Sequence, residues 1–319
     1  MGASGAMMAT DIRYTADHFR QWREEGFILI EDFFRPDEYE PVLEDFETMY
    51  ADCANADGIG SVLVAKEEGA IGSTHPAQFK NIDTLPYMGS EAINMISLHP
   101  ALIQLSRALL GVDEVSLYQS HTWAKYTGEA DYDQGFHCDF GNHTLTVPSD
   151  DVSMRCVDFI LYLTDVTDET GALHYVTRPD CNDVLGEGRV WAPTPQQQQE
   201  LLSRERSGAG RAGTLLAHSI DTFHRGTNLT EENGRRFTMT VGYKARGNEM
   251  ISFHVWQSAA NRPWDRVINH GSAEQLACLG IPEPGDAFWT DRTLRITQAR
   301  WPDWDMASYF DAAGVTRGR

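Results

Sequence analysis

The sequence predicts a single domain with a mainly β core of the barrel type and helices packed around it. Its 319 residues are in the range for one large β-barrel protein with added helices. Apolar residues recur at helical spacing over about residues 1–112, whereas about residues 113–248 alternate as strands do. We expect residues 249–319 to form helices and loops that pack against the core or close over its mouth as a lid.

Charge and cysteine usage restrict the partners and the compartment. A net charge of −21 and a pI of about 4.8 argue against nucleic acid and anionic membranes, because both bind clustered Lys and Arg. The sequence shows no apolar run of membrane-spanning length and no leader pattern. Five cysteines without a CxxC pair are typical of a reduced protein. We therefore expect a cytoplasmic protein, monomeric or homodimeric, that binds a small molecule.

The first predicted elements are a helix, a strand and a second helix. Residues 14–25 have an amphipathic pattern, with Thr15 at the N-cap position and Gly26 after the last turn. The apolar GFILIEDFF follows as a strand. Pro36 stands where the first turn of an acidic helix would begin. This segment is expected to be scaffold.

The rest of the N-terminal part predicts a loop and more helices. Residues 53–75 are rich in Gly and Ala without a clear period, which indicates a loop or mobile flap. SEAINMISLHPALIQLSRALLG then reads as one or two helices, with Pro100 at a helix start and Gly111 at its end. We expect these helices to cover one side of a sheet.

The first core strand, within residues 113–128, has two faces of different composition. One parity is mixed polar and bulky, as in a strand that faces a pocket: Leu117, Gln119, His121, Trp123 and Lys125. The other parity holds Tyr118, Ser120, Thr122 and Ala124. An edge strand with solvated Gln and Lys fits the pattern equally well.

The segment GFHCDFGNHTL, residues 135–145, carries candidate metal ligands. His137 and Asp139 are two residues apart, so on a strand both side chains would point to the same face. His224, in DTFHRGTN, could supply a third donor, and two histidines with one carboxylate form the face used by non-haem Fe(II) oxygenases. An HxD pair alone is a weak signal, since a lone histidine on a strand is often a hydrogen-bonded core residue. Cys138 would point away from such a site.

Two further segments predict core strands. MRCVDFILYLTDVT is a nearly continuous apolar run, typical of a central strand. DETGALHYVT adds a turn at Thr170–Gly171 and a short strand. Residues 181–211 are expected to be loop and polar helix, in which the QQQQ run is a solvated helix face.

The last core strand, GRRFTMTVGYKA, contains two adjacent arginines. Arg235 shares its parity with Phe237, which predicts that it lies on the apolar, inward face. Arg236 falls with Thr238 on the other parity and is expected outside. A buried arginine needs an anionic partner, which could be a ligand or a carboxylate of the chain.

The order of these features resembles the phytanoyl-CoA dioxygenase family of Fe(II)/2-oxoglutarate oxygenases. The matching residues are His137, Asp139, the segment TDVTDETGAL, His224 (224 − 137 = 87 residues later) and Arg235 (235 − 224 = 11 residues further). The segments GFILIEDFFRPDEYE, IPEPGDAFWT and RWPDWDMASYF are also similar to family segments, so the resemblance covers most of the chain.

The resemblance implies a double-stranded β-helix, or cupin-like jelly-roll, core flanked by helices. It implies that His137, Asp139 and His224 bind Fe(II) and that Arg235 binds the distal carboxylate of 2-oxoglutarate. Lys125 and Gln119 are secondary cosubstrate candidates. The remaining positions on the iron would take the 2-oxo acid and O2.

The expected activity is hydroxylation of a small organic substrate, coupled to decarboxylation of 2-oxoglutarate to succinate. Related halogenases lack the ligand carboxylate that is present here as Asp139, so hydroxylation is favoured over halogenation. Desaturation, epimerisation or cyclisation on the same site remains an alternative. A cupin-type binding protein without turnover is another. The acidic composition favours natural products or amino-acid derivatives over acyl-CoA.

Several further residues near the motifs are candidates for the site. The substrate-binding candidates are Phe140, Asn142, His121 and Trp123. His218 is the rival third metal ligand, and Arg178 either reaches an anionic substrate or caps a turn. The remaining histidines near the motifs, His143 and His174, are expected to be supporting or structural residues.

Overall fold

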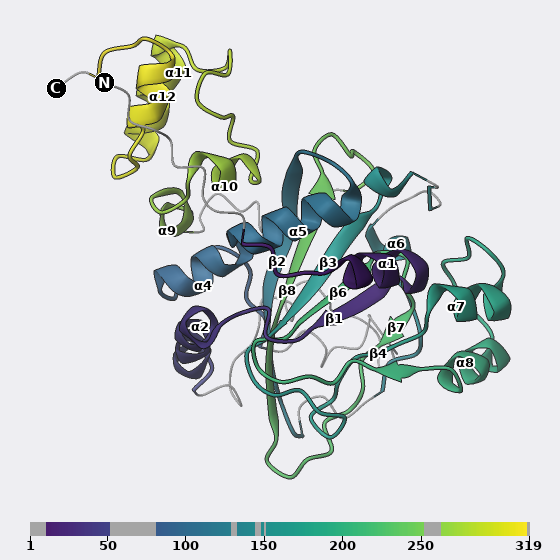
Figure 1. Cartoon of the computed structure of the whole chain (residues 1–319). Helices are drawn as coiled ribbons and strands as arrows, with labels where there is room; N and C mark the ends of the chain where they lie inside the picture. The colour runs from purple at the N-terminus through teal and green to yellow at the C-terminus, as the bar shows by residue number, and fades with distance from the viewer. Residues whose placement is uncertain are drawn as a thin grey trace.

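The structure is a computed structural model in which long strands lie side by side behind α5, with the last helices standing apart at one end (Figure 1). It describes residues 11–51, 81–128, 133–143, 148–149, 151–251 and 263–317. The loop expected at residues 53–75 lies outside the described residues.

Two antiparallel sheets form the core. The larger has the spatial order β1-β6-β3-β8-β2 and consists of β1 (Phe27–Ile30), β2 (Val115–Tyr126), β3 (Cys156–Tyr162), β6 (Leu215–Ser219) and β8 (Arg235–Ala245). The smaller has the order β5-β4-β7 and consists of β4 (His174–Tyr175), β5 (Arg206–Ser207) and β7 (His224–Arg225). An isolated bridge pairs His137 with His224 and extends the smaller sheet. Strands thus fill the part of the chain where the sequence predicts them.

Helices precede, interrupt and follow these strands. Those before β2 are α1 (Ala16–Glu25), α2 (Pro36–Met49), α4 (Glu91–Met95), the 3-10 helix η4 (Ile96–Leu98) and α5 (Pro100–Leu110). Those among the strands are α6 (Phe140–His143), η5 (Val152–Met154), α7 (Arg178–Leu185) and α8 (Pro195–Leu202). Those after β8 are α9 (Asp265–Ile268), α10 (Ala273–Ala277), α11 (Asp291–Arg300) and α12 (Ala307–Ala312). No helix among the described residues is long and apolar enough to cross a bilayer.

The predicted helix boundaries are confirmed where specific residues set them. The Thr15 hydroxyl accepts a hydrogen bond from the His18 amide at the start of α1. Gly26, with φ of 92°, ends this helix in the left-handed conformation that glycine adopts at little cost. Pro36 is the first residue of α2, and Gly111 ends α5.

The two faces of the larger sheet meet different surroundings. The odd-numbered residues of β8, Phe237 to Tyr243, belong to the main apolar core together with buried residues of α2 and α5. On the opposite face, Asp158 stands in register with both His218 and Gly242. The His218 ring lies 4.9 Å from the ring of His224 in the smaller sheet. The even-numbered residues of β8 therefore face the inside of the jelly roll.

The C-terminal helices pack on the outside of the helical layer. The Arg107 guanidinium of α5 pairs with Glu274 of α10 at 2.6 Å, and the Gln275 amide donates to the carbonyl of Leu98. Aromatic side chains form a separate apolar cluster that holds these helices together: Trp289, Trp304, Tyr309 and Phe310. A lid role for this region stays a prediction, since these contacts place it beside α4 and α5.

Candidate metal centre

Three predicted ligands meet between the two sheets. One donor atom each from His137, Asp139 and His224 lies within 4.8 Å of the other two. The Nε2 atoms of His137 and His224 are 4.0 and 3.9 Å from the Asp139 carboxylate, and the two rings are 4.6 Å apart. His137 and His224 come from segments far apart in the sequence that pair through reciprocal backbone hydrogen bonds of 3.0 and 2.8 Å.

The backbone fixes the orientation of both imidazoles. The Nδ1 atom of His137 lies 2.9 Å from the carbonyl of Gly135, and Nδ1 of His224 lies 3.0 Å from the carbonyl of Thr222. A carbonyl only accepts hydrogen bonds, so each Nδ1 carries the proton. Each Nε2 therefore presents its lone pair to Asp139, which is the tautomer that a metal ion requires.

Asp139 reaches the site differently from the prediction. Strand pairing with His224 ends at His137. Asp139 lies in the turn before α6 and not in a regular strand. The Asp139 carbonyl accepts the amide of His143 and so starts this short helix. Cys138 points away from the centre, as expected, and is buried in a separate apolar cluster.

The protonation states also suit a metal ion. Burial, together with the neighbouring His137, lowers the pKa of His224 to about 4, so this imidazole is neutral at pH 7. Burial alone would raise the pKa of Asp139, but the surrounding histidines, His224 first, outweigh it and hold this pKa well below its usual range. Neutral imidazole and ionised carboxylate are the metal-binding forms.

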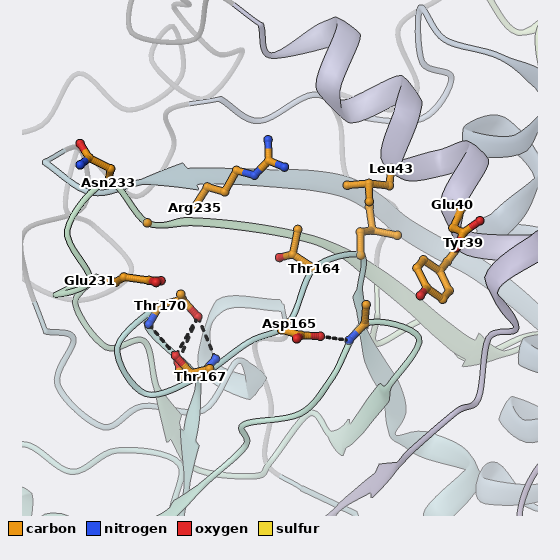
Figure 2. A pocket seen from close by; sticks show the side chains of 13 residues that line it. Tyr39, Glu40, Leu43, Thr164, Asp165, Thr167, Thr170, Glu231, Asn233 and Arg235 are labelled. Carbon is orange, nitrogen blue, oxygen red and sulfur yellow. Dashed lines mark hydrogen bonds between the residues drawn. The ribbon is translucent and has the colours of Figure 1, made fainter.

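The two arginines of β8 are placed opposite to the prediction. Arg235 is exposed (45% of its side chain), pairs with Glu47 of α2, and lines an outer pocket beside Leu43 (Figure 2). Arg236 is 6% exposed and carries the even parity that faces the jelly-roll interior. Arg235 and Arg236 do lie on opposite faces of β8, as alternation predicts. However, the apolar face of β8 packs on the outer helices, and its polar face lines the interior.

Lys125 accompanies Arg236 inside the jelly roll. The two residues stand in register on neighbouring strands, β2 and β8. Burial, with the added repulsion of the Arg236 charge, lowers the pKa of Lys125 to about 7. Two cationic side chains next to one another in a low-dielectric interior favour an anionic ligand.

Gln119 lies away from this cationic pair. Its register partner on β8 is Gly242, three side-chain rows from Arg236, and its Nε2 donates to Asp158 at 2.7 Å. The expected alternation of β2 also breaks here. A bulge at Tyr118–Gln119 lets both side chains reach Asp158, whereas strict alternation would place them on opposite faces.

Two of the four substrate-binding candidates lie on the interior face of the larger sheet. His121 and Trp123 lie on the interior face of β2, where the Trp123 Nε1 donates to Thr240. Phe140 is buried in the apolar cluster that also contains Cys138 and Tyr118, so a contact with substrate stays a prediction. The side chain of Asn142 is outside the described part of the structure.

The other candidates have structural partners or a second position near the centre. Arg178 donates to the carbonyl of Arg23 and lies 3.5 Å from Asp221, which supports its role as a cap. His174 contacts Asp168 and Glu205. His218, the rival ligand, groups instead with the carboxylates of Asp139 and Asp158.

Asp158 is the main residue of this site that the sequence analysis did not identify. It occupies the central strand β3, and its carboxylate lies beside Asp139 and His218. The available signal was a single acidic residue inside the apolar run CVDFILY, where an unpaired charge is costly.

Comparison with known families identifies the relatives of this site. The model of the family described as phytanoyl-CoA dioxygenase (PhyH) matches residues 22–237, which is more than half of the chain. The chain belongs to the phytanoyl-CoA dioxygenase family. This family is one of non-haem Fe(II)/2-oxoglutarate-dependent oxygenases, and the double-stranded β-helix expected for it is confirmed.

Solved structures share the fold of this phytanoyl-CoA dioxygenase family member. EctD from S. alaskensis with 2-oxoglutarate and 5-hydroxyectoine is 20% identical, with a TM-score of 0.56 over 80% of this chain and 84% of that chain. The epimerase SnoN, in complex with Fe3+, alpha ketoglutarate and nogalamycin RO, is 15% identical, with a TM-score of 0.52 over 73% and 86%. AviO1 from Streptomyces viridochromogenes Tue57 is 13% identical, with a TM-score of 0.53 over 75% and 98%. A search of curated proteins found no sequence match.

Proposed function

We propose that this protein is an Fe(II)/2-oxoglutarate-dependent oxygenase that hydroxylates a small organic substrate. The observation that carries the proposal is the pairing of two features in one interior. A two-histidine, one-carboxylate centre lies between the sheets, and the cationic pair Lys125 and Arg236 lies further along the same space. A metal centre beside an anion site is what an enzyme of this class requires.

His137, Asp139 and His224 would hold the iron. Their fit rests on the chemistry of the donor set, because each histidine has its Nδ1 proton held by a carbonyl and its Nε2 turned to Asp139. When bound, Fe(II) supplies the activation of O2 that converts 2-oxoglutarate to succinate and CO2 and inserts one oxygen atom into a substrate C–H bond. The protein holds the ligands and excludes bulk water from the interior.

Arg236, rather than Arg235, would bind the distal carboxylate of 2-oxoglutarate. A guanidinium fork holds a carboxylate at two points and so fixes the direction of the cosubstrate. Lys125 would add a second positive charge to balance the dianion. Gln119 is not proposed for this role, because it hydrogen-bonds Asp158 at the other end of the interior.

The structures that share the fold support a small organic substrate and leave a second candidate reaction. EctD is described with 5-hydroxyectoine and SnoN with nogalamycin RO, both small molecules. SnoN is described as an epimerase and SnoK as a carbocyclase, so epimerisation or cyclisation is the second candidate. Hydroxylation is preferred over halogenation because Asp139 supplies the carboxylate that halogenases lack, and the described residues show no feature that favours epimerisation or cyclisation.

A cytoplasmic location is also proposed, for a monomer or a homodimer. Its support is that the cysteines in the described part of the chain are free and buried, as in reducing compartments: Cys138, Cys156, Cys181 and Cys278.

Anaerobic titration tests the proposed function. The native protein should bind Fe(II), and addition of 2-oxoglutarate should then produce a visible charge-transfer band; admission of O2 should release succinate. Asp139→Ala should lose iron binding and both later signals, because one of three protein ligands is gone. Asp37→Ala, at an exposed carboxylate of α2, is the control and should behave as native. A native protein that gives neither band nor succinate would point to a binding protein without turnover.

A further inference from the structure

Asp158 is a buried carboxylate at one end of the jelly-roll interior. It lies on the central strand β3 and is 1% exposed. Its row across the larger sheet contains His218, Gly242 and Gln119, all on the interior face. The Asp158 carboxylate has no part in the proposed binding of iron or of 2-oxoglutarate.

One oxygen of Asp158 is held by two hydrogen bonds from neighbouring side chains. Its Oδ1 accepts hydrogen bonds from the Tyr118 hydroxyl at 2.5 Å and from the Gln119 Nε2 at 2.7 Å. The bulge in β2 brings both donors to the same side. Gly242 leaves the room they need, because a Cβ at this position would lie 2.5 Å from the Asp158 Oδ1. The carboxylate is therefore fixed in position by neutral donors.

The second oxygen of Asp158 has a weaker partner in the described part of the chain. There its hydrogen-bond donor is the Cys156 thiol at 3.6 Å, and a thiol is a weak donor. Within the described ranges, the side chains that hydrogen-bond Asp158 are those of Tyr118, Gln119 and Cys156, and none of them is a cation. A buried carboxylate without a cation is costly, so a cationic ligand would stabilise it.

His218 adds an acceptor next to the Asp158 carboxylate. It is 3% exposed, its Nδ1 lies 3.3 Å from the Tyr175 hydroxyl, and its Nε2 has no hydrogen-bond partner among the residues that the structure describes. One ring nitrogen of His218 and one oxygen each of Asp158 and Asp139 lie within 4.8 Å of one another. An atom at the centre of an equilateral triangle with this edge is about 2.8 Å from each corner, which is hydrogen-bond distance.

We infer that Asp158 and His218 bind a primary ammonium group of the substrate beside the metal centre. This inference rests on the proposed function. An ammonium carries three N–H donors and one positive charge, which matches three converging acceptors, two of them carboxylates. Its place next to Asp139 would bring the neighbouring C–H bonds of an amine substrate close to the metal, where an oxygenase must act.

The two ends of the interior are complementary in charge. Gly242 and Arg236 are six residues apart on β8, about 20 Å at the usual rise of a strand. The Arg236 end suits the cosubstrate dianion, and the Asp158 end suits a cation. A substrate and 2-oxoglutarate would thus approach the metal from opposite sides without competing for the same charges.

Benzylammonium is the probe for this inference, with benzyl alcohol as an uncharged molecule of similar shape. Both are titrated calorimetrically into the anaerobic protein loaded with Fe(II) and 2-oxoglutarate. Native protein should bind benzylammonium at least tenfold more tightly than benzyl alcohol, and Asp158→Asn should abolish this difference. The control Glu47→Gln removes the same charge from the surface and should preserve it.

Thermal unfolding of Asp158→Asn checks that the variant is folded, and a crystal structure of the native complex provides a test that needs no variant. The ammonium nitrogen should lie within hydrogen-bond distance of Asp158. An ammonium bound elsewhere, or equal binding by Asp158→Asn and native protein, would overturn the inference while leaving the proposed function intact. Two metal ions per native chain and one per Asp158→Asn chain would show a second metal site instead. A native protein that binds neither Fe(II) nor 2-oxoglutarate would overturn both proposals.

Discussion

Arg235 and Arg236 are neighbours in the chain with different electrostatic surroundings. Arg235 pairs with Glu47 at the solvent boundary, where water screens the interaction. Arg236 lies in the interior beside Lys125, where the effective dielectric is lower and an anion would be bound more strongly. The same side chain therefore has a structural role at one position and a proposed binding role at the next.

Substitution of Arg236 should weaken 2-oxoglutarate binding selectively. Arg236→Gln should raise the Kd by a factor of at least about 100, because two charge-assisted hydrogen bonds of about 1.5–3 kcal/mol each are lost. Anaerobic calorimetry of the Fe(II)-loaded protein measures this change. Arg235→Gln is the matched control and should stay within about threefold of native, as expected for an exposed pair. A larger effect at Arg235 would show instead that Arg235 binds the distal carboxylate of 2-oxoglutarate.

The pKa of Lys125 predicts how 2-oxoglutarate binding depends on pH. In the free site this pKa is about 7, because burial and then the Arg236 charge disfavour the ammonium form. A bound carboxylate would favour the ammonium and raise the pKa, so binding should take up a proton above pH 7 and weaken by up to about tenfold per pH unit. Calorimetry in two buffers of different ionisation enthalpy measures the uptake. Lys125→Met should lack it, and pH-independent binding by native protein would contradict the prediction.

At the level of elements, α8 supports the segment that carries His137. Gln198 accepts the Phe136 amide at 2.7 Å and donates to the Phe136 carbonyl at 2.9 Å, as a neighbouring strand would. Its side chain also donates to Ala192. The Gln198 side chain thus pairs with the backbone at the edge of the smaller sheet, next to the proposed metal ligand His137. The expectation that the QQQQ run is only a solvated face is wrong for this residue.

Removal of this side chain should loosen the His137 segment. Gln198→Ala should lower the free energy of unfolding by about 1–3 kcal/mol, since several neutral hydrogen bonds are lost. It should also weaken Fe(II) binding by about tenfold, because groups that orient metal ligands contribute on this scale. Urea unfolding and metal competition measure the two effects. Gln199→Ala, at the exposed next position, should change neither; equal effects in both variants would indicate a general loss of helix α8.

At the scale of the whole molecule, one charge cluster ties the N-terminal segment to two helices. The Arg13 guanidinium holds the Glu38 carboxylate of α2 with two hydrogen bonds of 2.6 and 2.7 Å. His99, at the N-cap of α5, lies 3.2 Å from the same carboxylate. These contacts join separate parts of the helical layer outside the sheet.

This cluster should make stability depend on acid pH. Burial raises the pKa of Glu38, but hydrogen bonds from Arg13 and the Arg35 amide outweigh it and lower the pKa from 4.5 to about 2. The ionised form is therefore stabilised by folding, and its contribution, up to about 3 kcal/mol above pH 4.5, should disappear as pH falls towards 2. Urea unfolding of native protein and Glu38→Gln should differ at pH 6 and converge near pH 2. Glu44→Gln, on the exposed face of α2, should match native throughout.

The parts predicted from sequence are those set by short-range patterns. Thr15, Gly26 and Pro36 fix helix boundaries through local hydrogen bonding and backbone conformation, so neighbouring residues suffice to place them. The apolar run of β3 likewise predicts a central strand. Tyr118 and Gln198 could not be assigned in this way, because a bulge and a contact across 62 residues decide their roles.

The sequence by itself determined the candidate ligands His137, Asp139 and His224, because donor type and order along the chain specify this chemistry. It also determined that Arg235 and Arg236 lie on opposite faces of one strand, since side chains alternate with a period of two. Only the tertiary structure decided which of those faces is the interior. Alternation gives relative orientation, and the absolute orientation depends on which layer packs against each face, here helices on one side and the smaller sheet on the other.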